Sequence, residues 1–402
     1  MLDLLLKYAH TQGITCIGVL WHTKISAFRE HPTPLFYTCI TSWLTELPIE
    51  RITSTDLVPT AFKSLFNDDL FESVVDFVVA MFRETREVYE NGPSIQVLYR
   101  ELYQLSSKVG DLGTDPDTFR GIIRMFAEAG EAWVVLIAHH PEDYFFLVQA
   151  IARCTAYPED LEVTKITFNF WFELTQLITV DKHKHAKEVL TPIYAGLVDT
   201  MISHLHYPDG NDRADIFKGD RVAEDKFRDF RHEMGDVLKD CCRVVGGSQC
   251  LIKAYTVVHR VLEQQARGEN VRWQDIEAPL FSMRMMAREV DTEENEVVPE
   301  VMKLLVQLPE HDKIRYAATL VLGRYTEWTS KHPEYLQFQL NYISSGFETA
   351  SKDVISAAAQ ALKHFCQDCK TVQFPPYVAK FLASRQLCHS IASILSNCFS
   401  GA

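Results

Sequence analysis

The cysteine and histidine spacing near residue 366 is the first pattern that could support chemistry. Cys366 and Cys369 are separated by two residues, and His364 precedes them. A C-x-x-C pair is half of a common zinc site, but a structural zinc needs four ligands and no second pair with suitable spacing follows. Both cysteines fall on or beside the apolar stripe of a predicted helix over 351–369. We therefore favour buried thiols, with metal or redox chemistry as the alternative.

Other candidate ligand patterns are weaker. His232-Glu233-x-x-Asp236 resembles a zinc-protease helix whose second histidine is replaced, so we interpret it as a polar helix face. The acidic run 209–215 lacks the ligand spacing of an EF-hand. Three histidine pairs are expected at helix ends, where a helix C-terminus stabilises a charged imidazole. These are His139 with His140, His183 with His185, and His204 with His206.

The sequence contains no pattern for nucleotide binding or nucleophilic catalysis. A phosphate-binding loop, a GxGxxG turn after a strand and a GxSxG elbow are all missing. No acid/base pair or activated nucleophile can be assembled from spacing alone. We expect no enzyme activity, no cofactor and no bound metal.

Composition narrows the class of protein further. The 402 residues carry a formal charge of −14, and Gly (17) and Pro (16) are both scarce. This argues against a loop-rich β protein, and the acidic balance makes nucleic acid an unsuitable direct ligand and favours basic partners. Ten irregularly spaced cysteines indicate free thiols in a reducing compartment. With no secretory signal and no uncharged stretch of about 20 residues, we expect a soluble intracellular protein without membrane insertion.

Helical periodicity runs through almost the whole chain. Apolar residues between 119 and 137, and again between 354 and 369, recur at the spacing of an amphipathic helix. Strict alternation over five or more residues is rare, and no Asn-Gly or Asp-Gly joins alternating runs. The fold class that follows is all-α.

An internal repeat with a period near 40 indicates how the helices are arranged. Ala317-Ala318 and Ala357-Ala358 lie 40 residues apart, and Asp312 and Asp353 open the two segments. Two helices per period of about 40 residues is the mark of a HEAT-repeat solenoid, here a superhelical one. We expect the small alanines to allow close helix approach, the aspartates to cap the second helices, and Arg315 to reach a neighbouring unit.

On this template the chain divides into seven complete helix pairs with partial units at both ends. A lone helix at 35–47 precedes them and a partial one near 375–383 follows. We assign 1–34 to an atypical N-terminal segment, 35–375 to the array and 376–402 to a divergent tail. The pairs are 52–66 with 69–88, 95–108 with 117–138, 141–154 with 158–180, 184–206 with 225–245, 247–266 with 272–290, 296–307 with 311–328, and 332–348 with 351–369.

Charged residues on the second helices are the candidates for partner contacts, because those helices generally line the concave side of a solenoid. Solvation alone is the simpler interpretation of each group. The long polar connection 206–224 is either a solvated flexible loop or a second contact region. The candidates are Arg83, Glu84, Arg86 and Glu87 on 69–88, Glu128 and Glu131 on 117–138, and Arg228, Arg231, Asp236 and Asp240 on 225–245.

Several stretches together resemble a known family. They are 39–48 (CITSWLTELP), 82–87 (FRETRE), 119–133 (FRGIIRMFAEAGEAW), 168–174 (FNFWFEL), 230–242 (FRHEMGDVLKDCC) and 308–316 (LPEHDKIRY). Over about residues 35–375 the chain resembles the transportin-SR branch of the importin-β superfamily, which includes the fungal mRNA transport regulators.

The resemblance implies a nuclear import receptor that shuttles between cytoplasm and nucleus through the nuclear pore. Such receptors bind Arg-Ser-rich or Arg-Gly-rich RNA-binding proteins as cargo, contact Phe-Gly repeat nucleoporins, and release cargo when Ran–GTP binds. Family members are about twice as long, so the resemblance places their Ran-binding repeats and their basic cargo helix outside this chain. The alternative is a HEAT-repeat scaffold that holds protein partners without responding to Ran.

Overall fold

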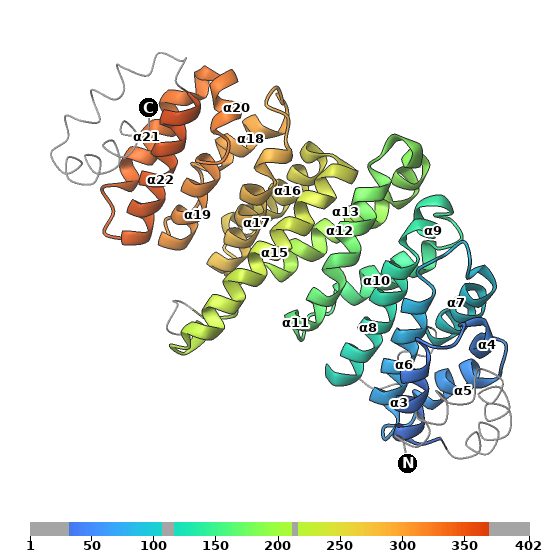
Figure 1. Ribbon diagram of the computed structural model, residues 1–402. Helices are drawn as coiled ribbons and strands as arrows, with labels where there is room; N and C mark the ends of the chain where they lie inside the picture. Colours follow the sequence, from blue (N-terminus) through green and yellow to red (C-terminus); the bar gives the residue numbers. More distant parts are fainter. Residues whose placement is uncertain (1–31, 107–115, 211–215, 370–402) are drawn as a thin grey trace, which may run out of the picture. The chain divides into compact units, whose positions relative to one another are not determined.

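The computed structural model describes residues 32–106, 116–210 and 216–369, and within these ranges the regular structure is entirely helical (Figure 1). The predicted partial helix at 375–383 and the predicted tail 376–402 lie outside the described residues, as do positions 1–31 of the N-terminal segment and 211–215 of the polar connection. The all-α prediction is confirmed.

The chain divides into two compact units, residues 1–177 and 178–402, and each is described by itself. The helices of the first unit are α3 (Pro34–Trp43), α4 (Glu50–Thr53), α5 (Leu57–Ser64), α6 (Phe71–Glu84), α7 (Gly92–Ser106), α8 (Pro116–Ala132), α9 (Val134–His139), α10 (Phe145–Thr155), α11 (Leu161–Thr164), the 3₁₀ turn η2 (Lys165–Thr167) and α12 (Phe168–Ile178).

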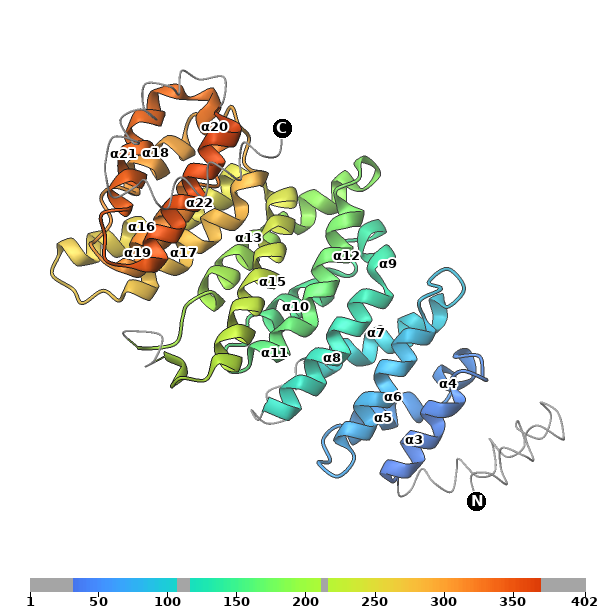
Figure 2. The same ribbon diagram turned by 60° about the vertical axis from the view of Figure 1, so that its left-hand side comes forward.

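The first unit consists of two layers of helices. Helices α3, α6 and α8 pack side by side in one layer, which Figure 2 shows in blue to teal. The second layer consists of α4 and α5, then α7, then α10. Helices of the two layers follow one another along the chain, so consecutive pairs stack in chain order.

The second unit repeats this two-layer arrangement. Its helices are α13 (Lys184–His204), α15 (Arg221–Val245), α16 (Gly247–Ala266), α17 (Trp273–Met286), α18 (Val297–Leu304), α19 (Asp312–Leu322), α20 (Thr326–Lys331), α21 (Leu336–Gly346) and α22 (Lys352–Asp368), with 3₁₀ turns η3 (Asp181–His183), η4 (Ala287–Glu289) and η5 (Pro333–Tyr335). Helices α15, α17, α19 and α22 form the layer of second helices, and α13, α16 and α18 lie in the other layer (Figure 1). The fold is the predicted HEAT-repeat solenoid of stacked helix pairs.

Some helices of the predicted pairs are shorter than the periodicity suggests, whereas α15 begins earlier than predicted and α16 has the predicted bounds. The helix predicted over 69–88 ends at Glu84, and the one predicted over 117–138 is interrupted at Trp133. The Trp133 indole N–H donates to Thr85 Oγ1 at 2.9 Å, and both side chains are fully buried. A buried indole needs such an acceptor. This bond therefore ties the end of α8 to the end of α6.

The expected capping by aspartate is wrong, whereas the reach of Arg315 is confirmed. The N-cap of α19 is His311, whose ring accepts from the Lys313 N–H, and Asp312 occupies the first turn. A first-turn acid still interacts favourably with the helix dipole. Arg315 donates to the Tyr342 carbonyl oxygen at 3.1 Å and so connects α19 to α21 of the next pair.

Small residues allow the helices to approach closely where neighbouring pairs meet. A Cβ added at Gly130 of α8 would lie 2.5 Å from Ile151 Cδ1 of α10 and 2.7 Å from Phe170 Cδ2 of α12. At Gly323, after α19, it would lie 2.9 Å from the Ala361 Cα of α22. Glycine at these positions is therefore required by packing and not by backbone conformation.

Gly130→Leu is expected to lower the stability of the chain by about 1–3 kcal/mol, because overpacking a well-filled interface costs about that much. The matched control is Gly196→Leu in α13, where a Cβ meets nothing within 4 Å. There the exchange is expected to raise stability slightly, since glycine is about 1 kcal/mol worse than alanine in a helix. Thermal unfolding followed by circular dichroism measures both. A Gly130→Leu protein as stable as the wild type would contradict the packing argument.

Candidate partner-binding surfaces

Ion pairs occupy much of the charge predicted on α6 and α8. Arg83 and Arg86 both donate to Glu128, at 2.8 and 3.0 Å, and the Glu128 side chain is only 11% exposed. Arg86 lies just beyond the end of α6, as does Glu87, and both are exposed together with Glu84. Glu128 therefore joins two neighbouring second helices, while Glu84 and Glu87 remain on the surface.

Glu131 has a different environment, although it lies only one turn from Glu128. It is half-buried and hydrogen bonded to Asn169 of α12, with the carboxylates of Glu173 and Glu128 nearby. Burial raises the pKa of Glu131 most and the two neighbouring carboxylates add to it, while the Asn169 hydrogen bond and the nearby Arg86 lower it in part. Glu131 and Glu173 thus bring two acidic groups of adjacent helices together, and a cationic side chain would relieve their repulsion.

The exposed candidates on α15 form pairs within their own helix. Arg228 contacts Asp225 at 2.9 Å and Asp236 contacts Lys239 at 2.8 Å, each at an i, i+3 spacing. Such surface pairs contribute little to stability, about 0.3–0.5 kcal/mol. Arg228 and Asp236 consequently remain available to a partner.

Arg231 is an interior residue rather than a surface one. It is 3% exposed, donates to Glu277 of α17 at 2.7 Å, and lies over the rings of Tyr207 and Phe281 at 4.4 and 4.0 Å. Losing one partner of a buried ion pair typically costs about 3–5 kcal/mol. This pair holds α15 against α17, and Arg231 is not available at the surface.

Asp240 is also buried, and among the described residues its carboxylate forms an ion pair with Arg243 alone, while Lys239 acts on it more weakly. Arg243 Nη1 lies 3.3 Å from it, at the edge of hydrogen-bonding range. Burial raises the pKa of Asp240 to about 7, although Arg243 lowers it in part. Asp240 is therefore partly protonated near neutral pH and is a poor anionic contact.

The polar connection 206–224 is held at both described ends, which argues against a freely solvated loop there. The Gly210 carbonyl oxygen accepts from Gln274 Nε2 at 2.9 Å and from Trp273 Nε1 at 3.3 Å. Phe217 packs 6.4 Å from Tyr207, ring centroid to ring centroid. The aromatic residues inside this polar stretch were the sequence signal for anchoring, and our prediction passed over them.

The cysteine and histidine candidates lie in structural positions. Cys369 is buried, and burial raises the pKa of its thiol to about 12. His183 precedes α13 and His185 lies in its first turn, so the expected helix C-terminus is wrong for this pair. Across residues 32–106, 116–210 and 216–369, no three His, Cys, Asp or Glu side chains are grouped to hold a metal ion.

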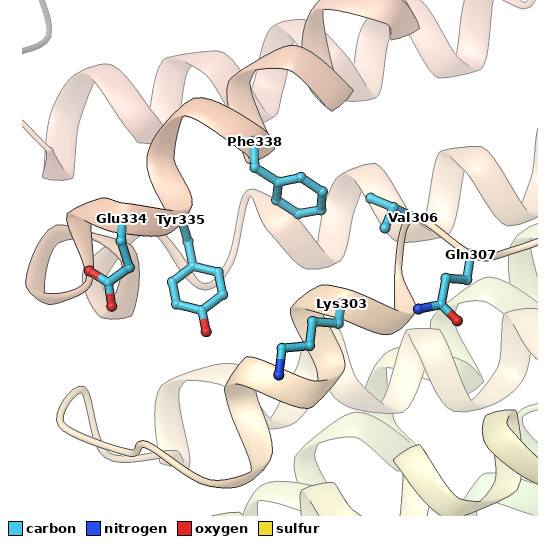
Figure 3. A pocket seen from close by; sticks show the side chains of 6 residues that line it. All are labelled: Lys303, Val306, Gln307, Glu334, Tyr335 and Phe338. Atoms are coloured by element: carbon cyan, nitrogen blue, oxygen red, sulfur yellow. The ribbon is translucent and has the colours of Figure 1, made fainter.

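A surface cavity of about 370 Å³ lies between α18 and α21 (Figure 3). Val306, Tyr335 and Phe338 give it an apolar lining, and Lys303, Gln307 and Glu334 complete it. Val306 is 41% exposed, which is high for an aliphatic side chain. The cavity can accept an aromatic or aliphatic side chain from outside.

In the described part of the chain, no helix has the length and apolar character to cross a membrane.

Asp240→Asn is expected to stabilise the chain by about 1–3 kcal/mol at neutral pH. The pKa of Asp240 is higher in the folded chain than its ordinary value of 3.8, so the folded state binds more protons between about pH 4 and pH 7. The contribution of Asp240 to the free energy of unfolding is therefore greatest below about pH 4, and it is lost as the pH rises to about 7. Urea unfolding from about pH 5.5 to pH 8 should show the variant's advantage growing with pH. Parallel curves would contradict the assignment.

Family models match two separate stretches of the chain. The second TPR domain of the transportin-3/importin-13 type matches residues 114–204, and the third TPR domain of the same type matches residues 295–375. The first match contains Glu128 and Glu131, and the second contains the cavity between α18 and α21.

Relatives align over most of the chain. A protein of Schizosaccharomyces pombe is 48% identical over 344 residues, covering 84% of this chain and 36% of the relative. The mRNA transport regulator MTR10 of Saccharomyces cerevisiae is 35% identical, covering 96% of this chain and 42% of the relative. The chain thus spans less than half the length of these relatives.

A solved structure of importin-13 in its cytosolic state superposes with a TM-score of 0.73 at 18% identity, covering 91% of this chain and 46% of that one. This likeness shows a shared fold. With the family models and MTR10, it confirms the resemblance inferred from the sequence. The chain belongs to the importin-β superfamily, in the branch that contains MTR10 and the receptors of the transportin-3 and importin-13 type.

Proposed function

We propose that this chain acts as part of a nuclear import receptor that binds basic cargo, contacts Phe-Gly repeat nucleoporins and releases cargo to Ran–GTP. It would shuttle between the cytoplasm and the nucleus through the nuclear pore. The observation that carries the proposal is the importin-type stack of helix pairs, together with membership of the MTR10 branch. A HEAT-repeat scaffold without Ran-dependent transport is the alternative.

For cargo, we propose the acidic face around Glu131 and Glu173, together with the exposed Glu84 and Glu87. Glu131 and Glu173 lie on neighbouring second helices, and their mutual repulsion favours a bound guanidinium. Arginine suits this role because its guanidinium is always charged and matches carboxylates in geometry. Arg-Ser-rich or Arg-Gly-rich segments supply such groups at short intervals. Arg228 and Asp236 are the remaining exposed candidates, on α15.

For nucleoporins, we propose the cavity lined by Val306, Tyr335 and Phe338. Its aromatic and aliphatic walls suit a phenylalanine ring, and the glycine after each phenylalanine lets a peptide backbone approach closely. Lys303 and Glu334 at this cavity can hydrogen bond the peptide backbone.

Glu131→Gln with Glu173→Gln is expected to weaken binding of a fluorescent Arg-Ser repeat peptide about tenfold, equivalent to about 1.4 kcal/mol. Glu90→Gln with Glu101→Gln is the matched control, because it removes the same charge without touching α8 or α12. Fluorescence anisotropy measures both. An equal loss in the control would mean that only net charge matters.

The same assay tests the response to Ran. Ran–GTP is expected to displace the bound peptide, and Ran–GDP is not. Retention of the peptide with both forms would favour the scaffold alternative.

Phe338→Ala is expected to weaken binding of a Phe-Gly repeat peptide severalfold, because it removes an aromatic wall of the cavity. Phe66→Ala is the control, since Phe66 is also partly exposed but lies in the first unit. Chemical-shift changes of a ¹⁵N-labelled Phe-Gly peptide report the binding. Equal effects of the two variants would remove the cavity from the proposal.

A further inference from the structure

Two arginines and a histidine from three second helices of the second unit meet at one small cavity. Arg284 of α17, Arg324 after α19 and His364 of α22 all line it, beside Gln360. Gly323 permits this convergence, because its missing side chain lets α22 approach at Ala361. Arg288 and Lys363 lie next to this group and are exposed. We call Arg284, Arg288, Arg324, Lys363 and His364 the basic surface.

Within the described residues, the arginines at the centre of the basic surface have no acidic partner. Arg284 Nε is buried and forms no hydrogen bond there. Other arginines of the second helices are engaged: Arg124 contacts Glu72 and Asp76, and Arg231 contacts Glu277. In the part of the chain that the structure describes, Arg284 and Arg324 thus lack the acidic partner that Arg124 and Arg231 have.

The neighbouring cations of this surface oppose one another. Burial, and then the nearby Arg324 and Arg231, lower the pKa of Arg284, while Tyr316 and Glu277 raise it in part. Burial and Arg324 also lower the pKa of His364 below its ordinary value of 6.5, against the opposite effect of Asp368, so this imidazole is largely uncharged at pH 7 and the repulsion is between the arginines. Like charges held close together destabilise the free chain, and a bound anion would relieve that repulsion.

We propose that the basic surface binds an extended acidic segment of a partner protein, with a Glu or Asp at about every third residue. The cavity itself measures about 10 Å³, enough for about one water molecule, so a ligand must lie over it rather than enter it. Packed helices lie about 8–10 Å apart, and an extended polyproline II segment advances about 3.1 Å per residue. Three residues of such a segment therefore cover the distance between two neighbouring helices. Because polyproline II has three residues per turn, every third side chain of the segment also points to the same face.

Charge favours an acidic partner segment over two other ligands of the basic surface, namely the chain's own residues 370–402 and a nucleic acid. Residues 370–402 of the chain contain no Asp or Glu, so that segment cannot supply the anions. A nucleic acid would bring many phosphates to a chain with a net charge of −14. A short acidic segment places its few charges only where the cations lie. The inference does not depend on the proposed function, since it concerns a partner of opposite charge on a different unit.

The test uses the whole chain and a fluorescent peptide of about 15 residues with Glu at every third position. Two comparison peptides carry the same glutamates in one block, or Gln in their place. Arg284→Gln with Arg324→Gln is expected to weaken binding of the spaced peptide at least tenfold. Arg260→Gln in α16 with Arg267→Gln just after that helix, both at exposed positions, is the matched control and is expected to change binding less than twofold.

A second variant protects the test against a folding defect. Arg288→Gln with Lys363→Gln changes only exposed side chains and is expected to weaken binding about threefold. Equal losses in the α16 control, or equal binding of the block peptide, would overturn the proposal. Stronger binding of a single-stranded oligonucleotide than of the spaced peptide would overturn it in favour of nucleic acid. Self-association abolished by the Arg284 and Arg324 exchange would overturn it in favour of a second copy of the chain.

Discussion

Each helix pair of this chain is too small to bury its own apolar faces, so it is stable only when packed on the next pair. The bond from Trp133 to Thr85 satisfies a polar group that burial between α6 and α8 would otherwise leave without a partner. Gly130 lets α8 approach the helices of the following pair closely enough to exclude water. Stacking thus depends on small residues at the contacts and on acceptors for buried donors such as the Trp133 indole.

The same requirement governs the charges. An acidic partner offsets much of the cost of placing a cation between two second helices, because an isolated buried charge is very unfavourable. Arg83 and Arg86 meet Glu128, and Arg231 meets Glu277 between two aromatic rings. These pairs contribute to the contacts between helix pairs, so they are not available for partners. Recognition is left to the charges that stacking does not use.

The periodicity of the sequence predicts the helix pairs well, because each pair is determined by nearby residues. The alanine repeat at 317 and 357 and the reach of Arg315 could be recognised without a structure. Which charged side chains are buried and which are exposed could not be predicted from the sequence. Arg231 and Arg228 lie one turn apart on α15 and look alike in sequence, yet one is buried against Glu277 and the other is exposed. The difference depends on α17, more than 40 residues away. Packing between helix pairs also creates the cavity between α18 and α21. It likewise brings Arg284, Arg324 and His364 together beside Gly323.

Stacking in one dimension also explains how surfaces of opposite charge can coexist in one acidic chain. Each helix pair contacts only its neighbours, so a change of charge on one pair alters the stability of few others. Substitutions at Glu131 and Glu173 in the first unit and at Arg284 and Arg324 in the second are therefore expected to affect stability independently of each other. In a single compact core, a cluster of unpaired arginines would weaken the whole domain. In a solenoid its effect on stability is local, and the free energy of binding a partner can offset it.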